Sequence, residues 1–345
     1  MLLFGCKKKQ ALPVIALPDT FIRAADLSFL PEIEQYGYTY YNSNNTSASA
    51  LDILKSNGCN TVRIRLWHTP SNQHSSFDEV YTFSKRVKAA GLKVWLDLHY
   101  SDTWADPGSQ IKPSAWSALS FTVLKDSVYN YTKYVTQIIK PEYIQIGNEI
   151  NSGLLFPDGA ISDIFKLSDL VKSGCKAVRD VSPQSKIIIH FAGITNADWF
   201  FSQLKNTSVD YDIMGLSYYP IWHGKSLDSL KTAISSLTLN NNKRVIIAET
   251  AYPFSLGYDD YTNNILGLST QLIPAYPATE QGQFNFMHDL KNMLNQNNYA
   301  IGFCYWGGEW TAYRGPVATN GSSWENQALF DFNHKALPVV TVFRK

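Results

Sequence analysis

The sequence is poor in cysteine, with four among its 345 residues. They stand at Cys6, Cys59, Cys175 and Cys304, and these wide spacings match neither a metal-binding motif nor a disulfide framework. The last three lie in or beside apolar segments, so we expect them to be buried thiols. The sequence therefore gives no sign of a cysteine-based metal site or of a cross-linked scaffold.

An excess of charge of one sign is also missing, because 30 basic and 29 acidic residues leave a net charge of +1. Proteins that bind nucleic acid or a membrane surface usually carry a marked basic excess, so neither partner is expected. No apolar run is long enough to form a transmembrane helix. No low-complexity linker and no internal repeat interrupts the chain.

The N-terminal segment, residues 1–19, differs from the rest of the chain. Its Leu3-Phe4-Gly5-Cys6 run, followed by lysines, resembles the lipobox of bacterial lipoprotein signals, in which the cysteine becomes the lipidated first residue. The apolar run is shorter than a signal peptide and lacks a basic region before it, so either the start codon is placed too late or the likeness is a coincidence. The first alternative predicts an extracellular or cell-surface lipoprotein anchored at Cys6.

Aromatic residues, in contrast, are abundant, with 20 Tyr, 18 Phe and 9 Trp. Carbohydrate-binding clefts use aromatic faces, because the C–H faces of sugars are apolar while their hydroxyls need polar partners. Many of these side chains must also fill a core. Composition therefore favours a carbohydrate-binding protein without establishing one.

From residue 20 onward, short apolar segments alternate with amphipathic ones, which indicates an α/β fold with a parallel sheet. Eight strands with helices between them predict a single-domain (β/α)8 TIM barrel over residues 20–345. Residues 29–35 are expected to form a loop, and 252–279 a long irregular connection that is functional or stiffened by a metal. The strands are expected at 21–26, 59–67, 92–100, 143–146, 186–191, 213–218, 245–248 and 300–305, and the helices at 48–57, 77–90, 116–139, 161–181, 197–205, 227–240 and 281–295.

Two of these apolar strands end in a glutamate, Glu149 and Glu249. In a parallel barrel the strand ends meet on one face, where catalytic groups lie. Paired carboxylates in that position are typical of glycoside hydrolysis. Either glutamate alone could equally be a neighbour of a helix N-cap or a solvated loop residue.

Polar and aromatic residues gather at the other predicted strand ends as well. Arg63 and Arg65 alternate onto one face of their strand, although either could serve only a structural ion pair. His99 could be a satisfied core histidine, and Trp306 a core residue. The joint occurrence is what favours a site, and its further members are Asp26, Trp104, Asn148, Tyr219, Glu309 and Trp310.

Several segments together resemble glycoside hydrolase family 53, the endo-β-1,4-galactanases that act on type I arabinogalactan. They span residues 25–250 in the order of the family, and the segment 101–107 is the most specific of them. The run from Trp306 to Trp310 departs from the family's Trp-Glu-Pro-Ala-Trp form. The matching segments are Ala25-Asp26-Leu27-Ser28, the residues 60–67 and 96–107, Gly147-Asn148-Glu149-Ile150, Gly215-Leu216-Ser217-Tyr218-Tyr219-Pro220 and Ala248-Glu249-Thr250.

The resemblance implies a retaining mechanism in which Glu149 is the general acid/base and Glu249 the nucleophile. Asn148 would bind the sugar 2-hydroxyl, and Arg65 and Tyr219 would stabilise the charge of the nucleophile. Trp104, Trp306 and Trp310 would stack on galactose faces, while Asp26 and His99 would also contact substrate. The chemistry would need no cofactor, the partner would be β-1,4-galactan, and the protein would be a monomer.

A structural calcium ion is a further expectation, because some members of this family carry one after the seventh strand. The corresponding segment here has the oxygen donors Asp259, Asp260, Asn263 and Asn264. Their spacing matches no specific calcium motif, so a plain polar loop is equally consistent with the sequence.

Two other functions remain open at this stage. The chain could be another retaining β-glycanase of the same clan, such as a β-mannanase or a β-1,4-glucanase. It could also be a non-catalytic glycan-binding surface lipoprotein, although the presence of both glutamates argues against that alternative.

Overall fold

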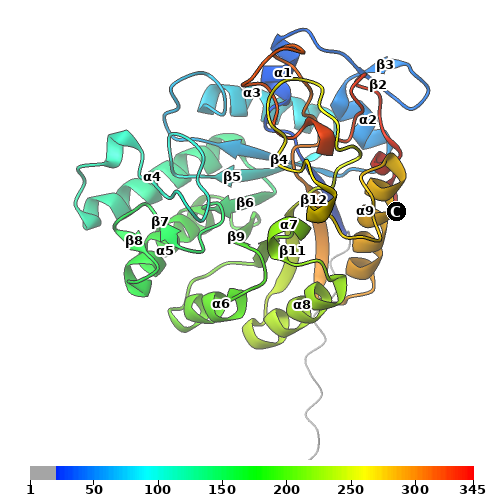
Figure 1. Ribbon diagram of the computed structural model, residues 1–345. Coiled ribbons are helices and arrows are strands. Elements are labelled where there is room, and N and C mark those ends of the chain that lie inside the picture. Colours follow the sequence, from blue (N-terminus) through cyan, green and yellow to red (C-terminus); the bar gives the residue numbers. More distant parts are fainter. Residues whose placement is uncertain (1–20) are drawn as a thin grey trace, which may run out of the picture.

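The computed structural model describes residues 21–345 and shows a closed barrel of eight parallel strands. Around the barrel each strand lies beside its neighbour in the chain, and β12 closes on β1. Figure 1 shows the strands at the centre with the helices outside them. The predicted single-domain TIM barrel is confirmed. The barrel strands are β1 (Ile22–Asp26), β4 (Thr61–Leu66), β5 (Lys93–Leu98), β6 (Tyr143–Ile146), β9 (Lys186–Ala192), β10 (Ile213–Ser217), β11 (Arg244–Thr250) and β12 (Ala300–Tyr305).

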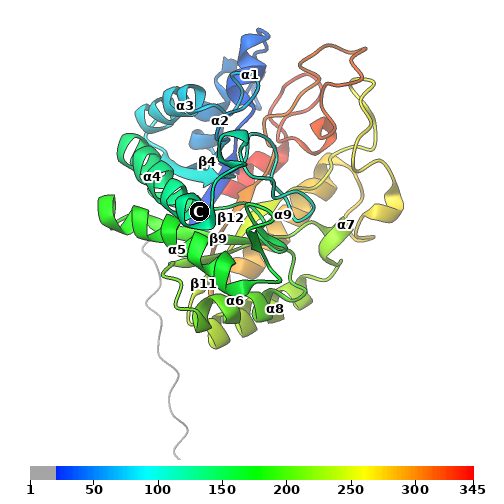
Figure 2. The same cartoon turned by 90° about the vertical axis from the view of Figure 1, so that its left-hand side faces the viewer.

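The helices form the outer layer, and Figure 2 shows α4 on one side between α3 and α5, packed against both. Serine side chains begin three of the helices: Ser49, Ser76 and Ser226 each accept a hydrogen bond from a first-turn backbone N–H. The helices are α1 (Leu30–Gln35), α2 (Ala50–Ser56), α3 (Phe77–Ala89), α4 (Phe121–Ile139), α5 (Ile164–Val181), α6 (Ala197–Asn206), α7 (Pro220–His223), α8 (Leu227–Asn241) and α9 (Glu280–Asn295).

Three predictions of local structure need correction. Residues 29–35 were expected to form a loop, but α1 occupies Leu30–Gln35, since a proline is tolerated in the first helical turn. Helix α4 begins at Phe121 rather than at 116, because Ser114–Trp116 forms a separate 3-10 turn. Two small hairpins also escaped prediction: β2 (Tyr40–Tyr41) with β3 (Ser47–Ala48), and β7 (Gly153–Leu154) with β8 (Gly159–Ala160).

The apolar core has two layers. The inner one fills the barrel with residues such as Ile22, Trp95, Ile188 and Ile246. The outer one lies between the strands and the helices, and every residue of β1, β4 and β12 is buried. Strands covered on both faces need no polar alternation, which is why β12 appears in the sequence as a continuous apolar run, whereas β1 and β4 also carry the buried Arg23, Arg63 and Arg65.

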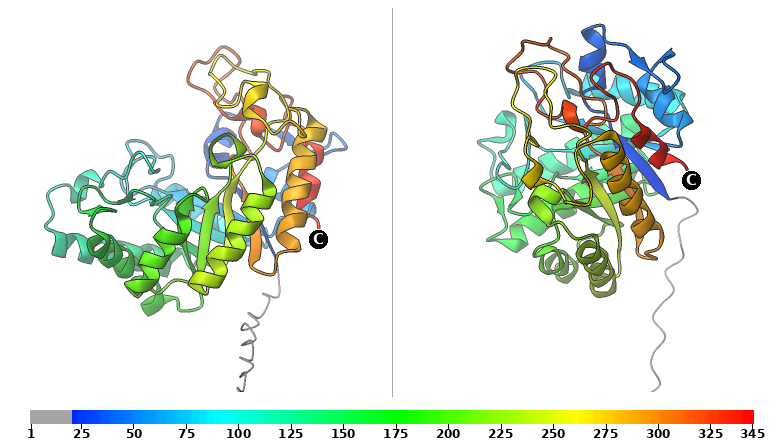
Figure 3. Two further views of the ribbon diagram at one scale, coloured as in Figure 1. Left: turned by 60° about the horizontal axis from the view of Figure 1, so that its bottom comes forward. Right: turned by 45° about the vertical axis from the view of Figure 1, so that its right-hand side comes forward.

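The connections after β11 and β12 are long and lie side by side over one end of the barrel (Figure 3). Tyr261 N–H donates to Ala318 O at 2.9 Å, and Ile265 N–H donates to Ser323 O at 3.1 Å. The predicted irregular stretch 252–279 is confirmed, apart from one 3-10 turn at Ser269–Gln271. These two connections form one wall above the strand ends.

Cys59, Cys175 and Cys304 are free and buried, as predicted. Among residues 21–345 no helix has the length and apolar content needed to cross a bilayer. Cys6 and the segment 1–19 lie outside the described residues. Lipid anchoring, the cell-surface location and the monomeric state therefore stay predictions.

Candidate active site

A cleft of about 440 Å³ opens beyond the carboxyl ends of the barrel strands. This is the face on which barrel enzymes carry their active sites. Of the residues expected from the sequence to form the site, those that line the cleft are Asp26, Arg63, Arg65, His99, Trp104, Asn148, Glu149, Tyr219, Glu249 and Trp306.

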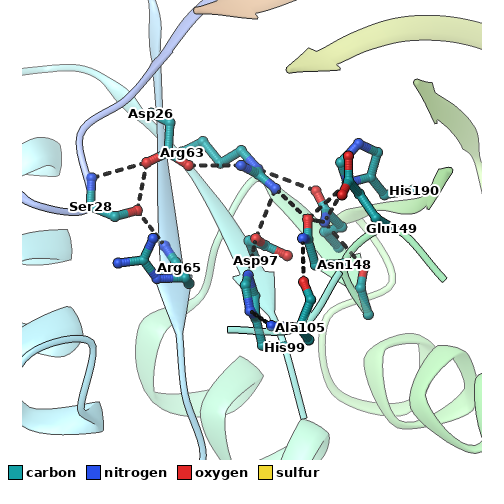
Figure 4. Close-up of polar contacts among 12 residues, drawn as sticks. Asp26, Ser28, Arg63, Arg65, Asp97, His99, Ala105, Asn148, Glu149 and His190 are labelled. Atoms are coloured by element: carbon teal, nitrogen blue, oxygen red, sulfur yellow. Dashed lines mark hydrogen bonds and ion pairs between the residues drawn. The ribbon is translucent and has the colours of Figure 1, made fainter. Parts of the chain in front are cut away.

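The buried side chain of Arg63, on β4, connects the site through contacts with three carboxylates. Its Nη1 lies 2.8 Å from Asp26 Oδ2, and its Nη2 lies 2.8 Å from Asp97 Oδ2 and 2.9 Å from Glu249 Oε1. Asp26 is its neighbour in the register between β1 and β4. Figure 4 shows the Arg63 side chain running from Asp26 toward Asp97 and Asn148. A buried arginine is stable only with such partners.

Arg65 was expected to be the ionic partner of Glu249, the predicted nucleophile. The structure corrects this expectation, because Arg63 makes that contact. Residues 63 and 65 both face the cleft, but Arg65 lies two positions further along β4 and turns away from Glu249. Its guanidinium stacks 3.9 Å from the ring centroid of Trp104, and its Nη2 lies 2.7 Å from His74 Nε2. Burial lowers the pKa of Arg65 to about 10. Its predicted contact with substrate remains a prediction.

Glu249, in β11, is held at both carboxylate oxygens. Oε1 contacts Arg63, and Oε2 accepts a hydrogen bond from the Tyr219 hydroxyl at 3.1 Å. The expected neighbourhood of Tyr219 and Glu249 is therefore confirmed. A carboxylate held by a cation and a hydroxyl suits a nucleophile, because both partners favour its charged form.

Glu149, just beyond β6, has an unusual backbone. Its φ is +47°, in the left-handed region, and it follows Gly147 at φ +79°. Such a conformation costs energy for a residue with a side chain and often occurs at functional sites. The Glu149 Oε1 atom accepts a hydrogen bond from the Ser217 hydroxyl. The turn thus directs a carboxyl group from the end of β6 into the cleft.

The two glutamates differ in their surroundings. Burial raises the pKa of both carboxyl groups, and the charge of Glu149 raises that of Glu249 further. Such a pair retains one proton where isolated carboxyls would both be ionised. The direct contact of Arg63 with Glu249 places the negative charge there and leaves the proton on Glu149. Two acids in contrasting environments are what acid/base and nucleophile roles require.

Asn148 and His99 are fixed by their neighbours. The Asn148 side-chain N–H donates to Ala105 O at 2.7 Å, and its Oδ1 accepts from Arg63 at 2.9 Å. His99 Nδ1 accepts from the Ala105 N–H at 3.1 Å, so its Nε2 carries the proton donated to Asp97 at 3.0 Å. Burial lowers the pKa of His99, which keeps it neutral. His99 thus holds the loop that carries Trp104, and its contact with substrate remains a prediction.

The aromatic wall agrees with expectation only in part. Trp104 is 37% exposed, and its ring centroid lies 6.1 Å from that of Trp306. Trp310, in contrast, is only 8% exposed and packs 4.2 Å from the Phe29 ring, behind the wall rather than in it. The expectation that Trp310 stacks on a sugar is therefore corrected, because Trp306 lines the cleft and Trp310 does not.

Several residues to which the sequence assigned no particular role also belong to the site. Asp97, His223 and the aromatic residues Trp222 and Trp324 line the cleft. Trp222 is 53% exposed, which suits a residue at the mouth. His190 lies behind the cleft with Gln145. Both are polar residues inside otherwise apolar strands, a signal that could have identified them. Trp324 carried no such signal, because its long connection has no periodic pattern.

In the loop expected to hold calcium, the side chains of Asp260 and Asn264 form hydrogen bonds with backbone groups. Asp260 accepts hydrogen bonds from the backbone N–H groups of Thr262 at 2.6 Å and Ser322 at 3.0 Å. Asn264 donates to Gly257 O at 3.1 Å. Within residues 21–345, no group of three or more His, Cys, Asp or Glu side chains is placed to hold a metal ion. Asp260 and Asn264 are therefore engaged in hydrogen bonds to backbone groups, and calcium binding stays a prediction.

A parallel barrel that carries two carboxylates at the ends of two strands, in a cleft walled by tryptophans, defines a glycoside hydrolase. The sequence model of glycosyl hydrolase family 53 matches residues 22–343. The chain belongs to this family.

Similar proteins cover almost the full length of the chain. An arabinogalactan endo-β-1,4-galactanase of Cellvibrio japonicus is 36% identical, with 94% of this chain and 90% of that protein aligned. The arabinogalactan endo-β-1,4-galactanase A of Aspergillus niger is 33% identical, with 97% of each chain aligned. The catalytic domain of an Ignisphaera aggregans family 53 protein has a TM-score of 0.90 at 39% identity, covering 96% of this chain and 98% of that one.

Proposed function

We propose that this protein is a retaining, endo-acting hydrolase of β-1,4-galactan, the backbone of type I arabinogalactan. The observation that carries the proposal is the contrast between its two acids. The Glu249 carboxylate contacts the Arg63 guanidinium and the Tyr219 hydroxyl, whereas among the described side chains the Glu149 carboxyl group contacts only the Ser217 hydroxyl. The names of the Cellvibrio and Aspergillus relatives support galactan rather than mannan or glucan as the substrate.

In the first step, a Glu249 carboxylate oxygen attacks the anomeric carbon. The bond from that carbon to the bridging oxygen breaks, and Glu149 gives its proton to this oxygen, which leaves with the released sugar chain. A covalent galactosyl-enzyme remains. In the second step, Glu149 takes a proton from water, whose oxygen attacks the anomeric carbon and releases Glu249. Two inversions give net retention of configuration.

The other residues assist these steps without changing bonds. Among residues 21–345 the second side-chain N–H of Asn148 has no partner, so it can donate to the sugar 2-hydroxyl, a contact that strengthens in the transition state. Trp104 and Trp306 offer apolar faces to the sugar rings. The Tyr219 hydroxyl keeps Glu249 oriented for attack.

The proposal predicts that the purified protein depolymerises β-1,4-galactan to short oligosaccharides and leaves mannan and cellulose intact. Proton NMR at early times should show the β-anomer of the new reducing ends first. Early appearance of the α-anomer would contradict the retaining mechanism. Cleavage of mannan or cellulose instead would favour another β-glycanase, and binding of galactan without cleavage would favour a glycan-binding protein.

Calcium stiffening of the 252–279 loop, around Asp259, Asp260, Asn263 and Asn264, is part of the same proposal. Its support is the length of the loop and its oxygen donors. If calcium binds only the folded protein, adding a chelator should lower the melting temperature, and calcium should restore it. An unchanged melting temperature, together with elemental analysis that finds no metal, would leave a loop held by its own hydrogen bonds.

A further inference from the structure

Behind Glu149 lies a row of hydrogen-bonded side chains that the mechanism above does not use. Ser217 donates to Glu149 Oε1, and the Ser217 Oγ lies 2.9 Å from His190 Nε2. His190 Nδ1 lies 3.1 Å from Gln145 Nε2. The three supporting residues come from β10, β9 and β6, which are consecutive neighbours in the barrel, and each is fully buried. Figure 4 shows His190 directly beside Glu149.

The direction of these hydrogen bonds follows from counting protons. A serine hydroxyl has one proton to donate, and Oε1 of Glu149 accepts it both when the acid carries its own proton on Oε2 and when it is ionised. Ser217 therefore donates to Glu149, and its oxygen must accept from His190 Nε2. This places the ring proton of His190 on Nε2 and makes Nδ1 an acceptor.

Gln145 supplies the donor that this arrangement needs. Its amide orientation is fixed because Oε1 accepts from Arg63 Nε at 3.3 Å and Nε2 donates to Gly147 O at 3.1 Å. Nε2 lies 3.1 Å from both His190 Nδ1 and Asn148 Oδ1, and we assign its remaining proton to His190 Nδ1 because Asn148 Oδ1 already accepts from Arg63. The other neighbour of Nδ1 is Asn148 Oδ1 at 2.9 Å, an acceptor that Arg63 already supplies with a proton.

We propose that Ser217 and His190 are positioning residues which occupy Oε1 of Glu149, so that the catalytic proton is confined to Oε2. Among the described residues, Oε2 has no hydrogen-bond partner and so is free for the leaving oxygen. The inference rests on the proposed function of Glu149 as the acid. In this arrangement His190, a buried neutral histidine, keeps the Ser217 hydroxyl directed at Glu149.

The same contact adjusts the acidity of Glu149, because a hydrogen bond to a carboxylate favours its ionised form and lowers its pKa. Removing the Ser217 hydroxyl should therefore raise the pKa of Glu149. The other groups that act on this carboxyl are Arg63, which lowers its pKa, and Asp97 and Asp106, which raise it. Glu249 and Tyr219 face it from β11 and the start of α7, and His190 is neutral because burial holds its pKa well below the usual value.

The first test is the pH profile of kcat/KM on galactan. The alkaline limb reports loss of the acid's proton, so Ser217→Ala should move that limb upward by about one pH unit. Ser217→Thr, which keeps a hydroxyl, should restore its position. His190→Phe should move it in the same direction as Ser217→Ala, while His190→Gln, which keeps a donor near the Nε2 position, should reverse much of the change. A limb that stays in place while all rates fall equally would reduce Ser217 to a structural role and overturn the proposal.

The second test needs no substrate and is made on the native protein, with a variant used only to assign one signal. In protein with 15N-labelled histidines, ring nitrogen shifts report which nitrogen carries the proton, and the signal of His190 is the one that disappears in His190→Gln. Between pH 5 and 8 we expect a neutral ring protonated at Nε2. Protonation at Nδ1 would overturn the proposal. If the native protein fails to cleave galactan, the proposed function fails, and this tautomer measurement still judges the hydrogen-bond network separately.

Discussion

Replacing Glu249 with alanine is expected to lower kcat on galactan by a factor on the order of 10⁵, because no glycosyl-enzyme can form without the nucleophile. Replacing Glu149 with alanine should lower it by about 10² to 10⁴, the usual contribution of a general acid/base. The variants should differ most on an aryl β-galactoside with a good leaving group. Glu149→Ala should still be glycosylated by that substrate and then stall, since no base activates water.

Azide separates the two roles by product stereochemistry. In Glu149→Ala, azide needs no base and should release a β-galactosyl azide after two inversions. In Glu249→Ala, any rescue should give the α-azide, because azide then attacks in a single inversion. Glu280→Ala is the matched control, since this exposed glutamate at the start of α9 is remote from the cleft and its loss should change neither rate nor product. Azide anomers exchanged between the two variants would reverse our assignment of acid and nucleophile.

Replacing Arg63 with methionine is expected to lower the free energy of unfolding by about 3–5 kcal/mol, because it leaves buried carboxylates without their cation. Asp26, Asp97 and Glu249 all contact this guanidinium. Arg86→Met is the matched control. Arg86 forms one ion pair, with Glu34 at 2.7 Å, and its side chain is 42% exposed, so its loss should cost at most about 1 kcal/mol. Denaturant unfolding of both variants measures the difference, and equal losses would contradict a central role for Arg63.

The loss of unfolding free energy in Arg63→Met should also depend on pH. Burial alone would raise the pKa of Asp97, but Arg63 and His99 hold it below its usual value, so in the native protein this group stabilises the fold above its unfolded pKa. Without Arg63 the folded-state pKa values of Asp97 and Glu249 should rise, and the loss of stability is relieved as falling pH protonates these carboxyl groups. We therefore expect a larger stability difference between variant and native protein at pH 8 than at pH 4. A difference that is constant with pH would show that lost packing, not charge, causes the deficit.

The sequence was sufficient to predict the barrel because its signals are local and repeated. Each buried strand is a short apolar run, and the alternation with helices leaves few possible topologies. The two catalytic candidates could be predicted for the same reason, since Glu149 and Glu249 each follow or end such a run. The helix at Leu30–Gln35 was missed because its six residues are too few to show a helical period.

What the sequence could not resolve depends on the three-dimensional arrangement. Arg63 and Arg65 are the same residue type and lie on the same face of the same strand. Only the positions of their neighbours decide that Arg63 pairs with Glu249 and that Arg65 stacks on Trp104. Trp306 and Trp310 stand four residues apart, yet only Trp306 lines the cleft. Trp324 reaches the cleft from a connection whose path follows from tertiary contacts rather than from a local pattern.

The pairing of the two long connections after β11 and β12 matters for anyone who wishes to redesign this cleft. Their backbones are joined at Tyr261 and Ala318, and Asn326 Nδ2 donates to Leu266 O at 2.6 Å. Ile265, from the first connection, and Trp324, from the second, both line the cleft. A loop transplanted from a relative would therefore meet a partner shaped for a different backbone. The two connections should therefore be exchanged together, as one piece, on an otherwise unchanged barrel.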